Sequence, residues 1–143
     1  MLALAADHII LDVPQFRATC LAGRQAADAG RIVTFGIKPT EPKTSYGYIL
    51  PGEAVGGTGV HAVKSFVEKP DAATAARYVR DGYLWNSGNF LFRADVLLAE
   101  LARLEPEMAE AILASVKNAT TDIGFLRLEP EAFARAPQIS IAY

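Results

Sequence analysis

The sequence is poor in cysteine and has no long apolar run. Cys20 is its one cysteine, so it cannot form an internal disulfide, and no second thiol is present for a metal cluster. A reducing cytoplasm fits this composition, with Cys20 as a small buried hydrophobe. No apolar run approaches the roughly 20 residues that a membrane-spanning helix needs, so we expect a soluble protein that does not contact membranes.

The sequence also lacks a large excess of charge of either sign. The 14 basic and 16 acidic residues leave a formal net charge of -2. No helical face carries a basic stripe that could follow a phosphodiester backbone, so nucleic acid is a poor candidate partner. With 51% hydrophobic and 21% charged residues over 143 positions, the chain can bury a core, which excludes global disorder.

Motifs of two large enzyme classes are missing. Ser87 lies in N-S-G, not in the G-x-S-x-G elbow of hydrolases, and the chain has no G-x-x-x-x-G-K-[ST] loop of ATPases. His8 and His61 have no acidic or cysteine partner at metal-ligand spacing. We therefore interpret both histidines as structural.

Alternating strand and helix patterns predict an α/β sheet with right-handed crossovers. A buried strand is expected at residues 2–6, a helix from near Pro14, capped by Asp12 and stopped by Gly30, and a strand at 31–37. The later elements are a loop at 38–47, a strand at 48–50, a hairpin tip at 52–59, a strand at 61–68, a helix from Asp71 to Gly82, a turn at 85–88, an extended segment at 89–93, two helices broken by Pro106, a short helix at 129–135 and a strand-like run at 138–143.

Polar residues at predicted strand ends are candidate site residues. Asp7 follows the first strand, where a carboxylate suits magnesium bridging phosphate groups, although acidic residues end many buried strands for structural reasons. Glu68 and Lys69 suit a sugar phosphate, since the carboxylate accepts hydroxyl protons and the ammonium neutralises phosphate. A solvated ion pair before a proline explains them equally well. Asn86 offers a side-chain amide, and Gly88 offers a backbone that a ligand can approach closely. A plain turn explains both residues equally well.

Several motifs together resemble mannose-1-phosphate guanylyltransferases in order and spacing. The combination of F-V-E-K-P with W-N-S-G is specific, and the resemblance runs from end to end. The bifunctional type, which carries a phosphomannose isomerase domain, looks especially similar. The motifs are A-D-H-I-I at 6–10, V-T-F-G-I-K-P-T at 33–40, Y-G-Y-I at 46–49, F-V-E-K-P at 66–70 and W-N-S-G-N-F at 85–90.

The resemblance implies a Rossmann-like, GT-A-like α/β nucleotidyltransferase fold with a mixed sheet and flanking helices. The chain would be an incomplete, central and C-terminal part (1–143) of one such domain. The implied reaction joins GTP and mannose 1-phosphate into GDP-mannose with release of pyrophosphate. Alignment and charge neutralisation would drive it with Mg2+, since the attacking phosphate oxygen is already anionic.

The resemblance also implies residue roles. Asp7 looks like the first Mg2+ ligand and Lys69 like the phosphate anchor, and these two are the implied catalytic residues. The implied contacts to the sugar are Gly47, Glu68, Lys69, Asn86 and Gly88.

Two departures from the family pattern bear on activity. The family's glycine-rich G-G-x-G-T-R-L-x-P loop, which holds the nucleotide, has no counterpart in this chain. Ala142 stands where the S-I-D-Y-A pattern places a second carboxylate ligand. We therefore expect this chain alone to make no GDP-mannose. Strands without neighbours would also favour self-association, a homo-oligomer included, or partial disorder.

Two alternatives stay open at the level of sequence. One is a relative that acts on another hexose 1-phosphate, such as glucose 1-phosphate, because E-K-P and a strand-end aspartate look similar across sugar nucleotidyltransferases. The other is a non-catalytic module that binds sugar phosphates or regulates a partner, which the missing loop and Ala142 favour.

Overall fold

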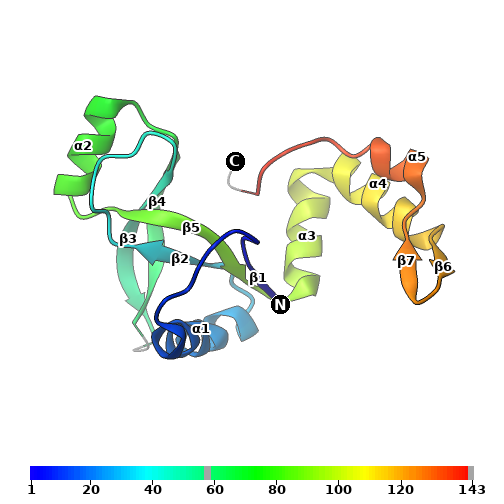
Figure 1. Cartoon of the computed structure of the whole chain (residues 1–143), viewed down its shortest axis with the longest axis horizontal. Helices are drawn as coiled ribbons and strands as arrows, with labels where there is room; N and C mark the ends of the chain where they lie inside the picture. Colours follow the sequence, from blue (N-terminus) through cyan, green and yellow to red (C-terminus); the bar gives the residue numbers. More distant parts are fainter. Residues whose placement is uncertain (57–58, 142–143) are drawn as a thin grey trace. The chain divides into compact units, whose positions relative to one another are not determined.

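The computed structural model describes residues 1–56 and 59–141, which form two compact units (Figure 1). The first unit holds residues 1–93 and the second holds residues 94–141. Among the described residues, every helix is too short or too polar to span a bilayer. The expectation that 1–143 belong to one nucleotidyltransferase domain stays a prediction.

The first unit is an α/β layer built on a five-stranded sheet. Two helices flank this sheet, so the expected α/β class with flanking helices is confirmed. Its elements in chain order are β1 (Leu2–Ala3), α1 (Val13–Asp28), β2 (Val33–Ile37), β3 (Gly47–Val55), β4 (Val60–Glu68), α2 (Ala72–Arg80) and β5 (Leu84–Leu91).

Strand β5 is the centre of the sheet. Leu91 pairs with Leu2 of β1 and with Val33 of β2, and Trp85 pairs with Ile37 of β2 and with Tyr48 of β3, always antiparallel. Strand β2 therefore runs along one edge of β5, while β1 and β3 share the other edge. The predicted strand-helix-strand unit exists, but β5 lies between its two strands.

Helix α1 covers one face of the sheet. The Asp12 side chain accepts a hydrogen bond from the Gln15 amide at 2.9 Å, so the predicted cap is confirmed. Gly23 lets the helix lie close to the sheet, because a Cβ there would meet Val33 at 3.3 Å and Leu91 at 3.5 Å. The left-handed φ of Gly30, 84°, follows the helix as predicted.

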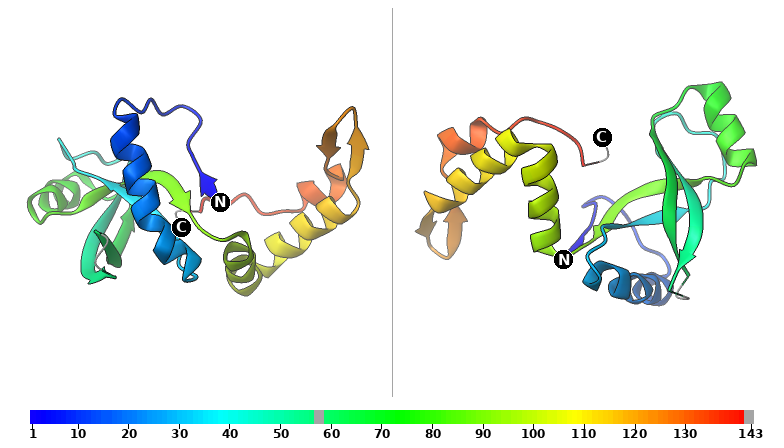
Figure 2. Two further views of the ribbon diagram at one scale, coloured as in Figure 1. Left: turned by 90° about the horizontal axis from the view of Figure 1, so that it is seen from below. Right: turned by 180° about the vertical axis from the view of Figure 1, so that it is seen from behind.

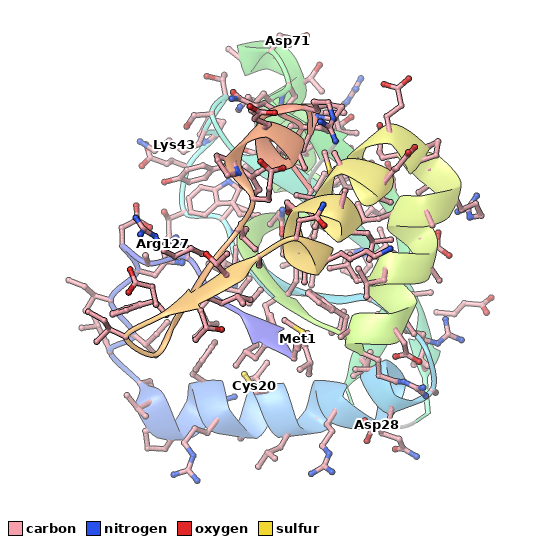
Figure 3. All side chains as sticks on the ribbon, turned by 90° about the vertical axis from the view of Figure 1, so that its right-hand side faces the viewer. Met1, Cys20, Asp28, Lys43, Asp71 and Arg127 are labelled. Atoms are coloured by element: carbon pink, nitrogen blue, oxygen red, sulfur yellow. The ribbon has the colours of Figure 1, made fainter. Side chains whose placement is uncertain are left out.

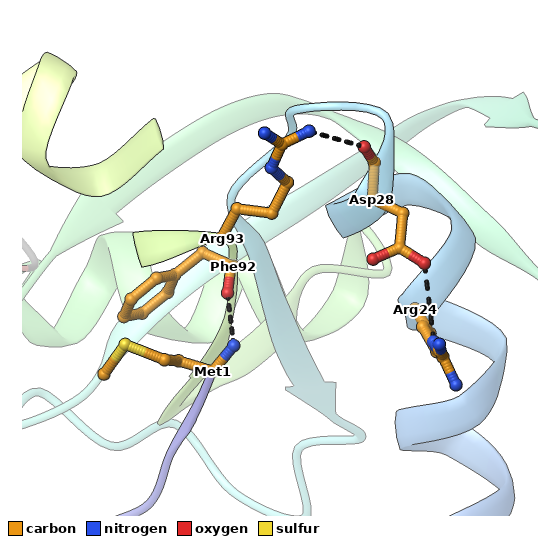
Figure 4. A network of polar contacts seen from close by, with 5 residues as sticks. All are labelled: Met1, Arg24, Asp28, Phe92 and Arg93. Atoms are coloured by element: carbon orange, nitrogen blue, oxygen red, sulfur yellow. Dashed lines mark hydrogen bonds and ion pairs between the residues drawn. The ribbon is translucent and has the colours of Figure 1, made fainter. Parts of the chain in front are cut away.

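The end of β5 is tied both to β1 and to α1 (Figure 4). The Met1 amino group donates to the Phe92 carbonyl at 2.6 Å, and the Phe92 amide donates back to Met1 at 3.0 Å. Arg93 donates to the Asp28 carbonyl at 3.4 Å, and Asp28 accepts from Arg24 within the helix. These contacts fix the start of β1 against the end of β5.

Helix α2 lies against the other face. The helix begins next to Asp71, near the predicted start, and the Asp71 side chain caps it by accepting from the Thr74 amide at 2.7 Å. The fully buried Tyr48 contacts Tyr78 of α2 with ring centroids 5.6 Å apart, and Tyr78 stacks on Tyr83 at 4.1 Å. Ile49, the next residue of β3, points to the α1 face.

The second unit is a helical cluster with one small hairpin, visible in both views of Figure 2. Its core lies on α4, where Ser115 is fully buried and its carbonyl accepts from the Glu129 amide at 3.0 Å. The predicted break at Pro106 is confirmed. The elements are α3 (Ala94–Leu104), α4 (Pro106–Lys117), β6 (Thr120–Asp122), β7 (Phe125–Arg127) and α5 (Pro130–Ala134).

Four expectations about strands are wrong. Residues 85–88 are not a turn but lie within β5, because this segment pairs with strands on both edges. Residues 52–55 extend β3, and the remaining predicted tip includes residues 57–58, which lie outside the described residues. The first strand ends at Ala3, because the Ala5 amide bonds the Asn89 side chain instead of a ladder carbonyl. Residues 138–141 form no strand.

The cysteine lies on α1 and can be found by its label in Figure 3. Cys20 is half-buried, not fully buried, and it is the free cysteine of the described chain. Burial raises the pKa of the Cys20 thiol. The side chain therefore stays protonated and serves as a small apolar group of the helix.

Candidate functional site

Three predicted residues meet where β3, β4 and β5 lie side by side. Gly47 is the β3 partner of Glu68 on β4. A Cβ on Gly47 would lie 2.5 Å from Glu68 Oε2 and 3.3 Å from the Asn86 Cβ. Only a residue without a side chain leaves the Glu68 carboxylate in this place. Gly47, Glu68 and Asn86 therefore form one polar cluster on a single face of the sheet, here called the Gly47 cluster.

Lys69 lies next to this cluster at the end of β4. Its Nζ is 3.8 Å from Glu68 Oε1, and the Lys69 side chain is 56% exposed while that of Glu68 is 18% exposed. The carboxylate is thus held in the protein while the ammonium stays accessible to a ligand.

The Lys69 backbone adopts a left-handed conformation with φ of 47°, which is uncommon for a residue with a side chain. The conformation is held by the Lys69 amide, which donates to the Tyr46 carbonyl at 3.2 Å. Pro70, which follows, is buried. Strained backbone of this kind gathers at functional sites, and here it turns the chain directly after the carboxylate.

Asn86 and Gly88 are linked to each other within β5. The Gly88 amide donates to Asn86 Oδ1 at 3.2 Å, and Gly88 has a φ of 72° and is exposed. Asn86 Oδ1 also accepts from Thr34 Oγ1 of β2 at 2.7 Å. Thr34 was not among the predicted site residues, although it lies in the V-T-F-G-I-K-P-T motif.

Asp7 is exposed and makes no hydrogen bond or ion pair with any described residue. The structure therefore brings it into no direct contact with the Gly47 cluster. Strands β1 and β3 pair with the same edge of β5, so the segment that carries Asp7 begins on the edge that β3 also borders. Asn89, a second residue that the sequence did not single out, holds this segment through the Ala5 amide at 2.9 Å.

The second predicted carboxylate position, occupied by Ala142, lies outside the described residues. Among the described residues, no group of three or more histidine, cysteine, aspartate or glutamate side chains could hold a metal ion. Any metal at Asp7 would therefore take most of its ligands from elsewhere, as Mg2+ does when it binds substrate phosphates and water.

A cavity of about 380 Å³ lies between α1 and the sheet. Apolar side chains such as Ile49 and Leu84 line it, together with the small helix residues Gly23 and Ala26. None of the six predicted site residues is part of its wall. Polar side chains such as Arg31 and His61 are also part of the wall, but the carboxylate and amide predicted to bind the sugar are not, so we do not assign this cavity to the sugar phosphate.

This chain belongs to the nucleotidyl transferase family, whose sequence model matches residues 1–129. The match includes all six predicted site residues.

Two curated relatives and one solved structure give the similarity in more detail. The chain is 48% identical to the xanthan biosynthesis protein XanB of Xanthomonas campestris pv. campestris (strain B100) over 144 residues, covering all of this chain and 30% of XanB. It is 45% identical to a mannose-1-phosphate guanylyltransferase of Sinorhizobium fredii (strain NBRC 101917 / NGR234), covering all of this chain and 28% of that protein. The chain thus spans less than a third of the length of these relatives.

The solved structure confirms the expected fold. A mannose-1-phosphate geranyltransferase from Thermus thermophilus superposes with a TM-score of 0.82 at 34% identity, over 98% of this chain and 39% of that one. The resemblance to mannose-1-phosphate guanylyltransferases that the motifs indicated is therefore confirmed at the level of relatives.

Proposed function

We propose that this chain supplies the sugar-phosphate site of a nucleotidyl transferase that makes GDP-mannose and pyrophosphate from GTP and mannose 1-phosphate. The observation that carries the proposal is the Gly47 cluster, which holds a carboxylate and an amide together beside the accessible ammonium of Lys69. The names of the relatives support mannose 1-phosphate as the sugar phosphate.

Each group of the site has a chemical task in this proposal. Glu68 accepts hydrogen bonds from sugar hydroxyls, and Gly47 leaves room for the Glu68 carboxylate to take this position. Lys69 neutralises the sugar phosphate, and the exposed Gly88 backbone borders the ligand. A phosphate oxygen of the sugar attacks the α-phosphorus of GTP, and the bond from that phosphorus to the leaving pyrophosphate breaks. The attacking oxygen is already anionic, so the residues align and neutralise charge rather than remove a proton.

Asp7 fits a role as a ligand of Mg2+. Its carboxylate is exposed and unpaired among the described residues, and magnesium in phosphate sites commonly uses one or two carboxylates beside phosphate oxygens. When bound, the ion supplies neutralisation of the phosphate charges.

We further propose a cytoplasmic setting, which the lone half-buried thiol of Cys20 supports.

A binding experiment on the 143-residue chain tests the proposal. We would titrate 15N-labelled chain with mannose 1-phosphate and follow the backbone amide resonances. We expect saturable shifts at Gly47, Glu68, Lys69 and Gly88, and much weaker effects from free mannose or inorganic phosphate. Shifts confined to the apolar cavity, or no saturable shift from a folded chain, would contradict the proposal. Tighter binding of glucose 1-phosphate would instead support a relative that acts on another hexose.

A further inference from the structure

The orientation of the Asn86 carboxamide is fixed by its neighbours. The Gly88 backbone amide can only donate, so the Asn86 atom 3.2 Å away is the oxygen, Oδ1. Thr34 Oγ1, 2.7 Å from the same oxygen, must then donate as well. Two donors therefore hold one oxygen, and an exchange of the carboxamide oxygen and nitrogen would lose the bond from Gly88 and reverse the one with Thr34, whose hydroxyl would then have to accept.

The nitrogen of the same carboxamide is left for a ligand. Asn86 Nδ2 has no hydrogen-bond partner among the described residues. It is also not a buried orphan, because the one described buried side-chain atom that lacks a partner is Trp85 Nε1. Asn86 Nδ2 is thus accessible to solvent on the residue whose Cβ adjoins Gly47. Its two N–H groups can be satisfied by an acceptor that enters the site.

Thr34 is well placed to hold this arrangement. It lies on β2, where the register shifts between Thr34 and Gly36, and it is half-buried. Besides Asn86, its hydroxyl lies 3.5 Å from the Asn89 carbonyl. A β-branched residue has few side-chain rotamers, so the hydroxyl is held toward β5 at low entropic cost.

We propose that Thr34 is a positioning residue of the sugar-phosphate site, which locks the Asn86 carboxamide so that Nδ2 donates to an acceptor oxygen of the bound sugar phosphate. The proposal rests on the proposed function for the identity of the ligand. The lock itself is a property of the ligand-free protein. Asn86 then contributes to specificity as a donor, whereas Glu68 in the same cluster contributes as an acceptor.

The first test needs no ligand. We would measure the 15N order parameter of the Asn86 side-chain NH2 group in wild type, Thr34→Val and Thr34→Ser. We expect a value of about 0.85, as in rigid backbone, in wild type and Thr34→Ser, and a fall below about 0.6 in the near-isosteric Thr34→Val, which cannot donate. An unchanged order parameter in Thr34→Val would overturn the lock, whether or not mannose 1-phosphate binds.

The second test is a double-mutant cycle on mannose 1-phosphate affinity. We expect Thr34→Val to weaken binding about fivefold, Thr34→Ser to stay within about twofold of wild type, and Asn86→Ala to weaken binding about tenfold. In the Asn86→Ala background, Thr34→Val should have no further effect. An equal loss in both backgrounds would mean that Thr34 acts on the fold and not through Asn86, which would overturn the proposal. Far-UV circular dichroism of each variant controls for folding.

The outcomes separate this proposal from the proposed function. If the wild type binds no mannose 1-phosphate but the order parameters respond to Thr34 as expected, the lock stands and the ligand assignment fails. If the wild type binds and neither the order parameter nor the cycle responds, the lock fails and the proposed function stands.

Discussion

The Asn89 side chain joins two segments that lie 84 positions apart in the sequence, since its Oδ1 accepts from the Ala5 amide at 2.9 Å. Asn89 is 4% exposed, so the acceptor of this partly buried bond lies inside the protein. It holds the chain two residues before Asp7. The two asparagines of W-N-S-G-N-F thus have different tasks: Asn86 faces the Gly47 cluster, and Asn89 fixes the segment of the proposed metal ligand.

Asn89→Ala should therefore destabilise the first unit by about 1–3 kcal/mol, because the partly buried Ala5 amide loses its acceptor. Urea denaturation measures the loss, and faster hydrogen exchange of the Ala5 amide locates it. Gln25→Ala, on the exposed side of α1, is the matched control and should change stability little. Unchanged exchange at Ala5 would show that the bond does not hold this segment.

Gly47→Ala should displace the Glu68 carboxylate, because the new Cβ would lie 2.5 Å from Glu68 Oε2. We expect a loss of about 1–3 kcal/mol in stability and a clear loss of mannose 1-phosphate affinity. The double variant Gly47→Ala/Glu68→Ala should regain part of the stability but no affinity, since the contact with Glu68 is gone while the 3.3 Å approaches to Asn86 and Phe66 remain. Full affinity in Gly47→Ala would refute the assigned role of this glycine.

Lys69→Ala should weaken mannose 1-phosphate binding about tenfold at low salt, because a hydrogen bond to a charged group contributes about 1.5–3 kcal/mol. Lys69→Ala should weaken binding of uncharged mannose much less, since the Lys69 ammonium interacts with the phosphate. Lys64→Ala removes an exposed lysine within β4 and serves as the control. Equal losses in the two variants would point to a general electrostatic effect. In a complete enzyme, Lys69→Ala should also lower transition-state stabilisation.

The lowered pKa of Asp71, at the start of α2, predicts that the stability of the folded protein depends on pH. The Thr74 backbone amide, and then the Thr74 hydroxyl, lower the pKa of the Asp71 carboxyl from its ordinary 3.8. A folded pKa below the unfolded one means that the contribution is complete above pH 3.8 and is lost as the pH falls through the folded pKa. Asp71→Asn keeps a capping acceptor, so its stability should fall less steeply in this acid range. The measurement is a denaturation curve at each of a series of acid pH values. If this interpretation is wrong, wild type and Asp71→Asn will lose stability in parallel as the pH falls.

Ile123 occupies an unfavourable conformation in the β6–β7 turn. Its φ is 46°, followed by 82° at Gly124, and its side chain is 92% exposed. Two positive φ values define the turn type for which Asn-Gly is preferred. Ile123→Asn should stabilise the second unit by roughly 1 kcal/mol. Ile9→Asn, at another exposed isoleucine whose φ is not positive, should give no such gain in a thermal denaturation experiment.

Local signals in the sequence predicted local structure well. Asp12 caps the helix that it was expected to cap, a helix starts next to Asp71 as expected, and Pro106 separates two helices. These features depend on side chains within four residues of each other, so the sequence contains all the information needed. The β6–β7 hairpin was missed because Ile123 is an unusual residue for its turn.

Signals that depend on distant pairing were less informative. Trp85-Asn86-Ser87-Gly88 has the composition of a turn, but its pairing with β2 and β3 makes it a strand. Thr34 and Asn89 act across 52 and 84 positions, and no local pattern distinguishes them from core residues. The Gly47 cluster could be found because its members lie in recognisable motifs. Self-association stays a prediction, supported by the 93% exposed side chain of Leu11.

The central place of β5 in the sheet has a consequence for folding during translation. Leu2 and Val33 both pair with Leu91, so neither β1 nor β2 has its sheet partner until that residue has left the ribosome. Sheets closed by such distant contacts fold slowly, and their earlier strands wait with unpaired edges. In a nascent chain stalled before β5, β1 and β2 should therefore be protease-sensitive, whereas β3 and β4 can already pair with each other.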